Sequence, residues 1–222
     1  MPAIWRVWQL ADSAFPSGGF AHSGGLEAAA QLGEVTCADA VERFAVSALW
    51  QAGTVGLPLV RAAFRDPDAA AVLDARCEAA LAGHVTRRAS RTQGRAWLAT
   101  CGHSFAGQPA IERLAETVRS RAAGGHLAVV LGASLRALEV GEAETLRLWL
   151  FLAARGVLSA AVRLGLIGPH EAQRMQDRLG SVADAVLAGC ATRGVDELAH
   201  SAPIAEVLAN LHDALPARMF QS

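Results

Sequence analysis

The chain contains no lysine and no tyrosine, and all twenty of its basic residues are arginines. A Schiff-base lysine, a phosphate-loop lysine and a tyrosine acid are therefore excluded, which removes several enzyme classes. Charged residues are also scarce, at 18% of the chain, whereas apolar residues reach 52%. A chain of 222 residues with this composition must bury much of its surface or share part of it with a partner.

The chain also lacks closely spaced cysteines and long apolar runs. Its four cysteines lie far apart and form no CxxC pair, which indicates a reducing environment and a cytoplasmic protein. The longest charge-free run, residues 44–60, is broken by glycines and a proline, so we expect no membrane span and no membrane partner. The formal charge of −1 gives no electrostatic attraction to nucleic acid.

Apolar residues recur at intervals of three and four among many alanines, a spacing typical of helices. We therefore predict an all-α fold of about ten helices. The predicted helices span residues 25–32, 36–52 (with Thr36 as N-cap), 54–64, 66–81, 86–101, 109–121, 126–139, 142–166 and 169–190, with a short one after Pro203. No repeat or linker divides the chain, so we expect one domain over 1–222, with flexible segments at 1–12 and 213–222.

The segment SAFPSGGFAHSGGLE, residues 13–27, is the most unusual part of the sequence, and we call it the opening loop. It combines four glycines, one proline and two phenylalanines before an alanine-rich helix. Glycine reaches backbone conformations closed to other residues, and proline fixes one dihedral angle. A segment rich in both is shaped for catalysis, for phosphate binding or for docking a partner.

Ser23 is the one residue of this loop that suggests catalysis. The sequence Ala21-His22-Ser23-Gly24-Gly25 lacks only the first glycine of the hydrolase nucleophile elbow. That motif needs a strand before the serine and a helix after it, and no strand is expected here. A serine hydrolase built on Ser23 is therefore an unfavoured alternative, and we predict no catalytic residues.

Metal-binding motifs are present only in part. His170-Glu171 begins a zinc-protease motif, but Arg174 stands where its second histidine belongs. Glu197 and His200 form one ExxH pair, whereas a di-iron bundle needs two pairs and two further carboxylates. We predict no metal site and no cofactor bound by this chain.

A basic stripe recurs at helical spacing and is formed by Arg87, Arg88, Arg91 and Arg95. It is either a solvated face that pairs with acidic neighbours or a site for a carboxylate or phosphate of a partner.

Ser159 and Arg163 lie four residues apart on the long predicted helix. Because a buried arginine needs an acceptor, internal pairing is one interpretation, and a subunit contact is the other.

Four segments, taken in order, resemble the UreF family of urease accessory proteins. The opening loop matches the family pattern of Phe-Pro, a glycine, an aromatic residue, a serine and Gly-Leu-Glu. ASRTQGRAWL at residues 89–98 is the second segment, and HLAVVLGASLRAL from His126 with LSAAVRLGLIG at residues 158–168 is the third. The fourth is the C-terminus, which matches at Pro203, His212, Arg218, Phe220 and Ser222.

The resemblance covers nearly the whole chain in one register, with a few departures. The family usually has Asn or Gln shortly before SAAVRL, where this chain has Gly156 and Val157. It usually has a tyrosine where Pro216 stands and an arginine where Gln221 stands.

The resemblance implies an all-α protein that is commonly a dimer and is not an enzyme. It implies binding to the accessory protein UreD (also called UreH) and to the GTPase UreG, and through them to apo-urease. Ni²⁺ and GTP with Mg²⁺ are then handled by the complex, which couples GTP hydrolysis to nickel transfer. A direct nickel-binding chaperone is an alternative that would need three or more converging ligands.

We expect two docking segments for these partners. In the opening loop the predicted surface consists of Phe15, Pro16, Phe20, Ser23 and Glu27. Glu27 alternatively only charges the first turn of the helix that follows. In the C-terminal tail, residues 216–222, Arg218 and Phe220 are typical of a peptide that orders on binding, and a frayed end is the alternative. Arg91, Arg95 and Arg163 complete the predicted partner-binding residues.

Overall fold

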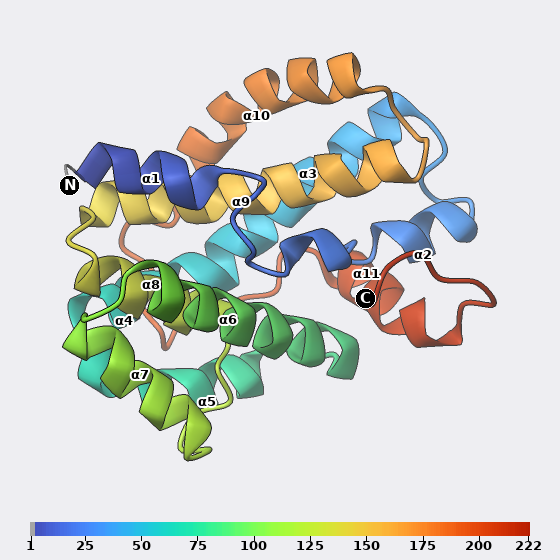
Figure 1. Cartoon of the computed structure of the whole chain (residues 1–222). Coiled ribbons are helices and arrows are strands. Elements are labelled where there is room, and N and C mark those ends of the chain that lie inside the picture. The colour runs from blue at the N-terminus through green and yellow to red at the C-terminus, as the bar shows by residue number, and fades with distance from the viewer. Residues whose placement is uncertain (1–2) are drawn as a thin grey trace.

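The computed structural model describes residues 3–222, and this range contains helices and no strands. The predicted all-α class is confirmed. Short turns join the helices (Figure 1), which are α1 Ala3–Ala11, α2 Leu26–Gln31, α3 Ala38–Gln51, α4 Leu57–Arg65, α5 Ala70–Ala80, α6 His84–Ser104, α7 Pro109–Arg119, α8 Leu127–Ala137, α9 Glu142–Arg163, α10 Pro169–Gly189 and α11 Pro203–Leu211.

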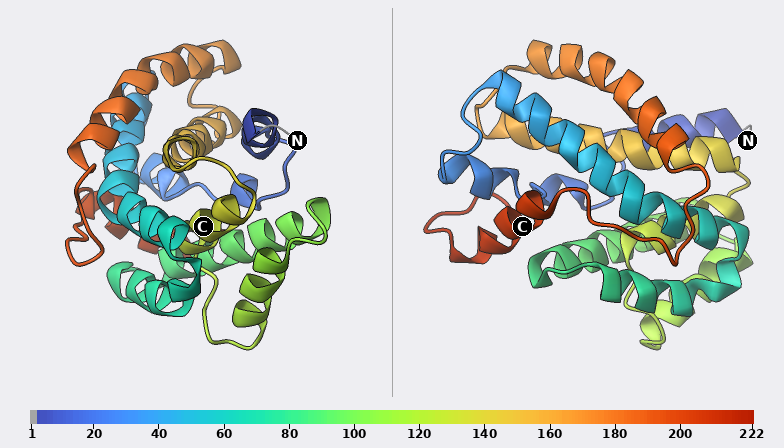
Figure 2. Two further views of the ribbon diagram at one scale, coloured as in Figure 1. Left: turned by 90° about the vertical axis from the view of Figure 1, so that its left-hand side faces the viewer. Right: turned by 180° about the vertical axis from the view of Figure 1, so that it is seen from behind.

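The helices form two groups that pack against each other (Figure 2). One group contains α1, α3, α9 and α10, and the other contains α5, α6, α7 and α8. Helix α4 continues from α3 and packs against both α8 and α9, so it joins the two groups. Helix α11 packs against α2 and α6. The opening loop and the C-terminal tail therefore meet near the boundary between the groups (Figure 1).

Helix α9 is the central helix of the first group, as its apolar composition predicts. Helices α1, α3 and α10 surround it in the end-on view of Figure 2. Within residues 3–222 it alone, with 22 residues, is long and apolar enough to cross a membrane. However, half of its apolar stretch is buried inside the fold. Its composition is therefore explained by its place in the core.

A single π-helical turn, Ala52–Gly56, connects α3 to α4. Proline is tolerated in the first turn of a helix, and Pro58 lies there because α4 begins at Leu57. The Trp149 indole nitrogen donates a hydrogen bond to the Ala52 carbonyl at 2.9 Å. The same ring lies against Gly56, where any Cβ atom would collide with it. This close approach fixes α9 against the turn.

The N-terminal segment contains a helix that the sequence pattern did not predict. Residues 3–11 form α1, and residues 1–2 lie outside the described range. Leu10 is buried and Arg6 donates a hydrogen bond to the Leu138 carbonyl, so this helix contacts the rest of the fold, while the flexibility expected at 1–12 stays a prediction. The predicted N-cap at Thr36 is wrong, because Cys37 precedes the first residue of α3 and no side chain caps that helix.

Candidate functional site

The opening loop is anchored to α6 by its first residues. Phe15 is buried, and its ring packs edge-on against Trp97 with the ring centroids 5.2 Å apart. The Pro16 carbonyl accepts a hydrogen bond from Thr100 Oγ1 at 2.8 Å. These contacts hold the loop on the body of the protein, and the partner contact predicted for both residues stays a prediction.

The end of the loop passes very close to α11 at Gly25. Its φ angle is 92°, and a Cβ atom there would lie 3.0 Å from the Ala209 nitrogen. Only glycine combines this left-handed backbone with such a close approach. The loop therefore enters α2 along a path that brings Ser23 and Glu27 toward the C-terminal tail.

The C-terminal tail pairs with the opening loop through backbone hydrogen bonds. The Gln221 amide donates to the Ala21 carbonyl at 2.8 Å, and the Ser23 amide donates to the Ser222 carbonyl at 2.5 Å. Ser23 Oγ donates to the same carbonyl at 3.0 Å. The two predicted docking segments are thus joined into one structure, and the tail is already seated in the isolated chain.

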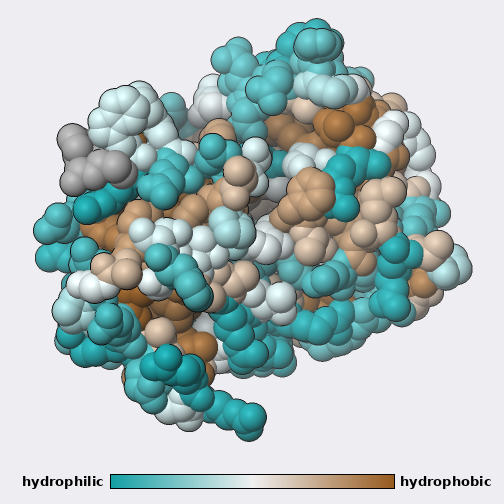
Figure 3. Space-filling model, viewed as in Figure 1, coloured by the Kyte–Doolittle hydropathy of each residue, from teal (hydrophilic) through white to brown (hydrophobic). Residues whose placement is uncertain are grey.

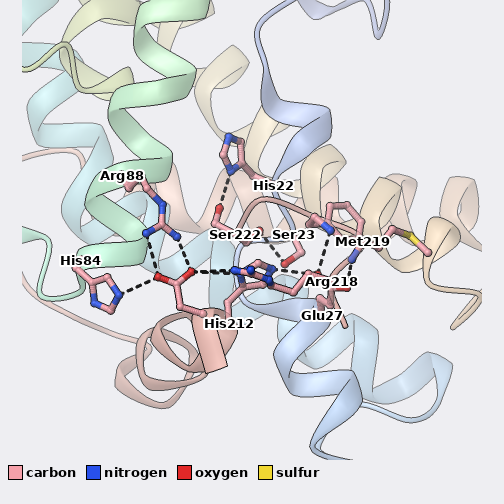
Figure 4. Close-up of polar contacts among 11 residues, drawn as sticks. His22, Ser23, Glu27, His84, Arg88, His212, Arg218, Met219 and Ser222 are labelled. Carbon is pink, nitrogen blue, oxygen red and sulfur yellow. Dashed lines mark hydrogen bonds and ion pairs between the residues drawn. The ribbon is translucent and has the colours of Figure 1, made fainter. Parts of the chain in front are cut away.

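Glu27 holds the tail from the other side (Figure 4). Its carboxylate is 2% exposed and accepts hydrogen bonds from the Met219 amide at 2.6 Å and the Phe220 amide at 3.2 Å. His212 Nε2 lies 3.0 Å from the same carboxylate. Glu27 lies in the first turn of α2, as the second interpretation from the sequence has it, but the side chain is buried and also binds the tail. The sequence did contain a signal for these contacts, because Glu27 lies in a mostly apolar helix and a buried carboxylate needs hydrogen-bond partners.

Arg163 links the loop and the tail through their aromatic rings. Its guanidinium lies 3.8 Å from the centroid of the Phe20 ring and 4.2 Å from that of Phe220. It also donates a hydrogen bond to the Phe20 carbonyl. Cation–π contacts of this kind favour arginine, whose planar group stacks on two faces at once. The pairing of Arg163 is therefore internal, and its partners are the loop and the tail.

Asp213, in the short turn after α11, connects this part of the chain to His84 and Arg88 of α6. Arg88 donates two hydrogen bonds to its carboxylate at 2.7 and 3.0 Å, and His84 Nε2 lies 3.1 Å away. Arg218 adds an ion pair at 3.5 Å. The hydrogen bond from Arg88 is the main reason that the pKa of Asp213 falls to about 2. The carboxylate therefore stays ionised at any physiological pH.

His22 is buried between the loop and the tail, and its Nδ1 lies 2.5 Å from Ser222 Oγ. Burial lowers the pKa of His22 to about 4, and the nearby charges of Arg88 and His212 contribute. His22 faces Ser222, and among the described residues the hydrogen-bond partner of Ser23 Oγ is the Ser222 carbonyl, not a histidine or a side-chain carboxylate. The described residues also place no strand before Ser23, so the hydrolase alternative lacks the geometry that it requires.

The basic stripe on α6 is used within the chain. Arg91 pairs with Glu78 at 2.5 Å, and Arg95 donates from Nε to the Gly124 carbonyl at 3.0 Å. Burial alone would raise the pKa of Glu78, but hydrogen bonds from His126 and Arg91 lower it overall. The structure therefore supports the interpretation of a face that pairs with its neighbours, and Arg91 and Arg95 gain no partner site from their arrangement.

A buried polar cluster at the start of α8 was not predicted. Asp74 accepts hydrogen bonds from the backbone amides of Gly124, Gly125 and His126 at 2.5, 3.1 and 2.7 Å. His126 is fully buried, with Nε2 2.7 Å from Glu78 and Nδ1 3.0 Å from Ser90. The double glycine before an apolar helix is the local signal for such a cluster. Its partners lie 36 to 52 residues away, beyond the reach of sequence periodicity.

A mostly apolar cavity of about 1000 Å³ lies between the loop, the tail and helices α3, α6 and α9. Phe20, Arg163, Phe220 and Ser222 are among the residues that line it. Part of the cavity wall is therefore made by the tail. Apolar side chains also reach the surface between polar ones on the face shown in Figure 3.

Residues 3–222 contain no group of three or more His, Cys, Asp or Glu side chains placed to hold a metal ion. His200 Nδ1 lies 2.7 Å from Glu206, not beside Glu197, and Glu171 pairs with Arg174. The partial motifs of the sequence are thus taken up by structural pairs. The direct nickel-binding alternative gains no ligand set from the described residues.

Comparison with known proteins gives the same family as the sequence motifs. The family model named UreF matches residues 35–180. Urease accessory protein F of Oryza sativa subsp. indica is 35% identical over 98% of this chain and 85% of that protein. The protein of the same name from Arabidopsis thaliana is 34% identical, over 98% and 92%. Urease accessory protein UreF of Dinoroseobacter shibae is 33% identical, over 98% and 97%. This chain belongs to the UreF family of urease accessory proteins.

Proposed function

We propose that this chain is a scaffold in a urease maturation complex that binds UreD (UreH) and the GTPase UreG. In this role it regulates the GTP-dependent delivery of Ni²⁺ to apo-urease without catalysing a reaction itself. Nickel is the cargo of the complex, and GTP with Mg²⁺ belongs to the GTPase. Membership of the UreF family supports a role in urease maturation. Four free cysteines are consistent with action in the cytoplasm.

The observation that carries this proposal is the joining of the opening loop and the tail into one surface. The contacts that join Ser23 and Glu27 to residues 219–222, which we call the seam, are mostly buried. Beside them, Phe20 on the loop is 68% exposed and Met219 on the tail is 55% exposed. Aromatic, methionine and arginine side chains are enriched where proteins bind each other. We assign this loop–tail surface to one of the two protein partners, with Phe20, Arg218 and Met219 as its contacts.

A second apolar surface supports a homodimer. Trp5 and Trp8 on α1 are each more than half exposed, and their rings contact each other with centroids 4.9 Å apart. Phe151 on the neighbouring helix α9 is also exposed. Exposed large apolar side chains such as the Trp5–Trp8 pair are costly to leave in water, and a second copy of the chain would cover them.

The test is assembly of this protein with its cognate UreD and UreG, followed by size-exclusion chromatography with light scattering. Samples with and without Mg²⁺ and a GTP analogue would be compared. We expect one species that contains all three proteins. Phe20→Ala should weaken its formation at least tenfold, whereas Val72→Ala, which truncates an apolar side chain 63% exposed on α5, should not.

Two results would contradict the proposal. No ternary species under any nucleotide condition would refute the scaffold role. An intact complex with Phe20→Ala would refute the assignment of the loop–tail surface while leaving the scaffold role in place.

A further inference from the structure

Ser90, His126 and Glu78 form a chain of hydrogen bonds in which a serine lies beside a histidine that is itself held by a carboxylate. His126 Nδ1 lies 3.0 Å from Ser90 Oγ, and its Nε2 lies 2.7 Å from a carboxylate oxygen of Glu78. The three residues come from α6, from the N-cap position of α8 and from α5. A nucleophile, a base and a group that orients the base, each within hydrogen-bond distance of the next, are the arrangement that activates a serine.

The directions of these hydrogen bonds follow from the charge of Glu78. Although burial opposes it, hydrogen bonds from His126 and Arg91 lower the pKa of Glu78, so the carboxylate is ionised. An ionised carboxylate only accepts, and Nε2 of the neutral His126 ring must therefore carry the hydrogen. Nδ1 is left as an acceptor, to which Ser90 Oγ donates its own hydrogen. A hydroxyl that donates to an imidazole is ready to lose its proton when it attacks.

The other charged groups near His126 hold the ring in place and do not compete for it. Asp74 is occupied by three backbone amides at the start of α8. Arg87 and Arg91 lie 3.9 and 2.5 Å from the carboxylate of Glu78. The side chain of His126 is fully buried, so its ring has no contact with solvent. Nδ1 is thereby kept toward the serine.

Ser90 can be reached from the cavity of about 1000 Å³, because it is half-buried and is one of the residues that line this cavity. Cys77 lines the same cavity, but burial raises the pKa of its thiol to about 12, so the thiol stays protonated and is a poor nucleophile. The cavity walls are mostly apolar. The group that fits beside Ser90 is therefore an apolar chain.

The N-terminus of α8 lies beside the serine, where negative charge would develop. The Leu127 amide donates to Ser90 Oγ at 3.3 Å. The next residue, Ala128, also lines the cavity, and its amide is in the first turn of α8, where amides have no partner within the helix. Such amides, together with the helix dipole, stabilise the oxyanion that forms when a serine attacks an ester.

We propose that Ser90 is an acyl-accepting nucleophile activated by His126, and that the cavity takes esters with a long apolar acyl chain. Ser90 Oγ attacks the ester carbonyl carbon, and its proton passes to His126 Nδ1. The bond from Oγ to the acyl carbon forms and the ester C–O bond breaks. The leaving alkoxide takes the proton from Nδ1 and departs as the alcohol. Glu78 is a positioning residue, and this reactivity concerns the chain alone, separately from the scaffold role.

The test is reaction of the full chain with p-nitrophenyl octanoate, followed by release of p-nitrophenolate and by mass spectrometry of its peptides. We expect one equivalent of p-nitrophenolate and an octanoyl group on Ser90. A positioned base contributes about 10²–10⁴-fold, so Ser90→Ala should be acylated at least about 100-fold more slowly. Ser104→Ala, which removes an exposed serine of α6, should match the natural chain. Because p-nitrophenyl acetate lacks the apolar chain, it should react at least about tenfold more slowly than the octanoate.

Glu78→Gln tests the positioning role through the pH profile of acylation. The carboxylate favours the imidazolium form of His126, so its loss should move the midpoint of the profile to lower pH and reduce the plateau rate. Glu34→Gln, which neutralises an exposed carboxylate, should leave the profile unchanged. A purely structural role of Glu78 would lower the rate without moving the midpoint.

The proposal would be overturned if the natural chain released p-nitrophenolate no faster than Ser90→Ala, or if the octanoyl group were found on another residue. The peptide map of the natural chain gives this answer even where a variant folds poorly. Equal rates with acetate and octanoate would overturn the assignment of the cavity to the acyl chain. An unmoved pH midpoint in Glu78→Gln would overturn the positioning role of Glu78.

Discussion

Replacing Glu27 by alanine removes the acceptor of three hydrogen bonds from the centre of the seam. The backbone amides of Met219 and Phe220 and the ring of His212 would all lose their partner. Hydrogen bonds to a charged group contribute about 1.5–3 kcal/mol each, so the simple sum is roughly 5–9 kcal/mol. That sum is too large, because the tail amides can reach water once the tail detaches. We expect the free energy of unfolding to fall by about 2–4 kcal/mol.

Urea unfolding followed by tryptophan fluorescence gives this value, since the chain contains five tryptophans. Hydrogen exchange of residues 219–221 should show lost protection in the same variant, while the amides of α8 and α9 remain protected at native conditions. Glu27→Gln retains one carbonyl acceptor and should lose about half as much. Glu34→Ala removes an exposed carboxylate just after α2 and should change stability by less than about 0.5 kcal/mol.

One outcome would refute the reasoning. If Glu27→Ala matched Glu34→Ala in stability and its tail amides stayed protected, the carboxylate would not be holding the tail. The seam would then depend on the aromatic contacts with Arg163 and on the backbone pairing with Ala21 and Ser23.

Three further predictions follow from the same geometry. Gly25→Ala should lower the free energy of unfolding by about 1–3 kcal/mol, measured by thermal unfolding, because Gly25 has a positive φ and lies close to Ala209. Its control is Gly156→Ala, which should be neutral or slightly stabilising because the space around the Cβ position is open. Arg163→Lys should lose about 1 kcal/mol, since an ammonium cannot stack on two rings, and the loss should shrink when Phe220→Leu is already present. A thiol reagent should modify only the exposed Cys37 in the native chain and all four cysteines in denaturant. The reason is that the other three are buried, and burial raises the pKa of the Cys77 and Cys101 thiols to about 12. Rapid modification of a second thiol in the native chain would contradict the packing of these helices.

The helices were predictable because their signals are local. Apolar spacing marks their faces, and breaks such as Gly168-Pro169 mark their ends. Helix α1 was missed for an equally physical reason. Trp5 and Trp8 face outward, so the apolar residues of this segment do not all lie on its buried side. The exact start of α3 was also missed, because no side-chain cap marks it.

The site was predictable in its parts but not in its connection. The opening loop and the tail were each expected to dock onto a partner, yet they are bound to each other in this structure. The bonds that join them span about 190 residues, from Glu27 to Met219 and Phe220. No periodicity or spacing rule reaches that far. The relevant clue was the cost of burying a carboxylate in the apolar helix Leu26–Gln31, which predicts a partner without naming it.

The chemistry of the seam also explains how the chain can depart from the family pattern in its tail. By the resemblance noted in the sequence, Pro216 and Gln221 stand in place of an expected tyrosine and arginine, and no side chain of either residue makes a hydrogen bond to the opening loop among the described residues. Glu27 and Ala21 bind the backbone amides of residues 219–221, and Ser23 binds the Ser222 carbonyl. Such contacts hold the path of the tail whatever side chains it carries, with the Phe220 ring on Arg163 as the main exception. The outward-facing side chains of the tail are then free to differ with the partner, while the backbone contacts that hold the tail stay the same.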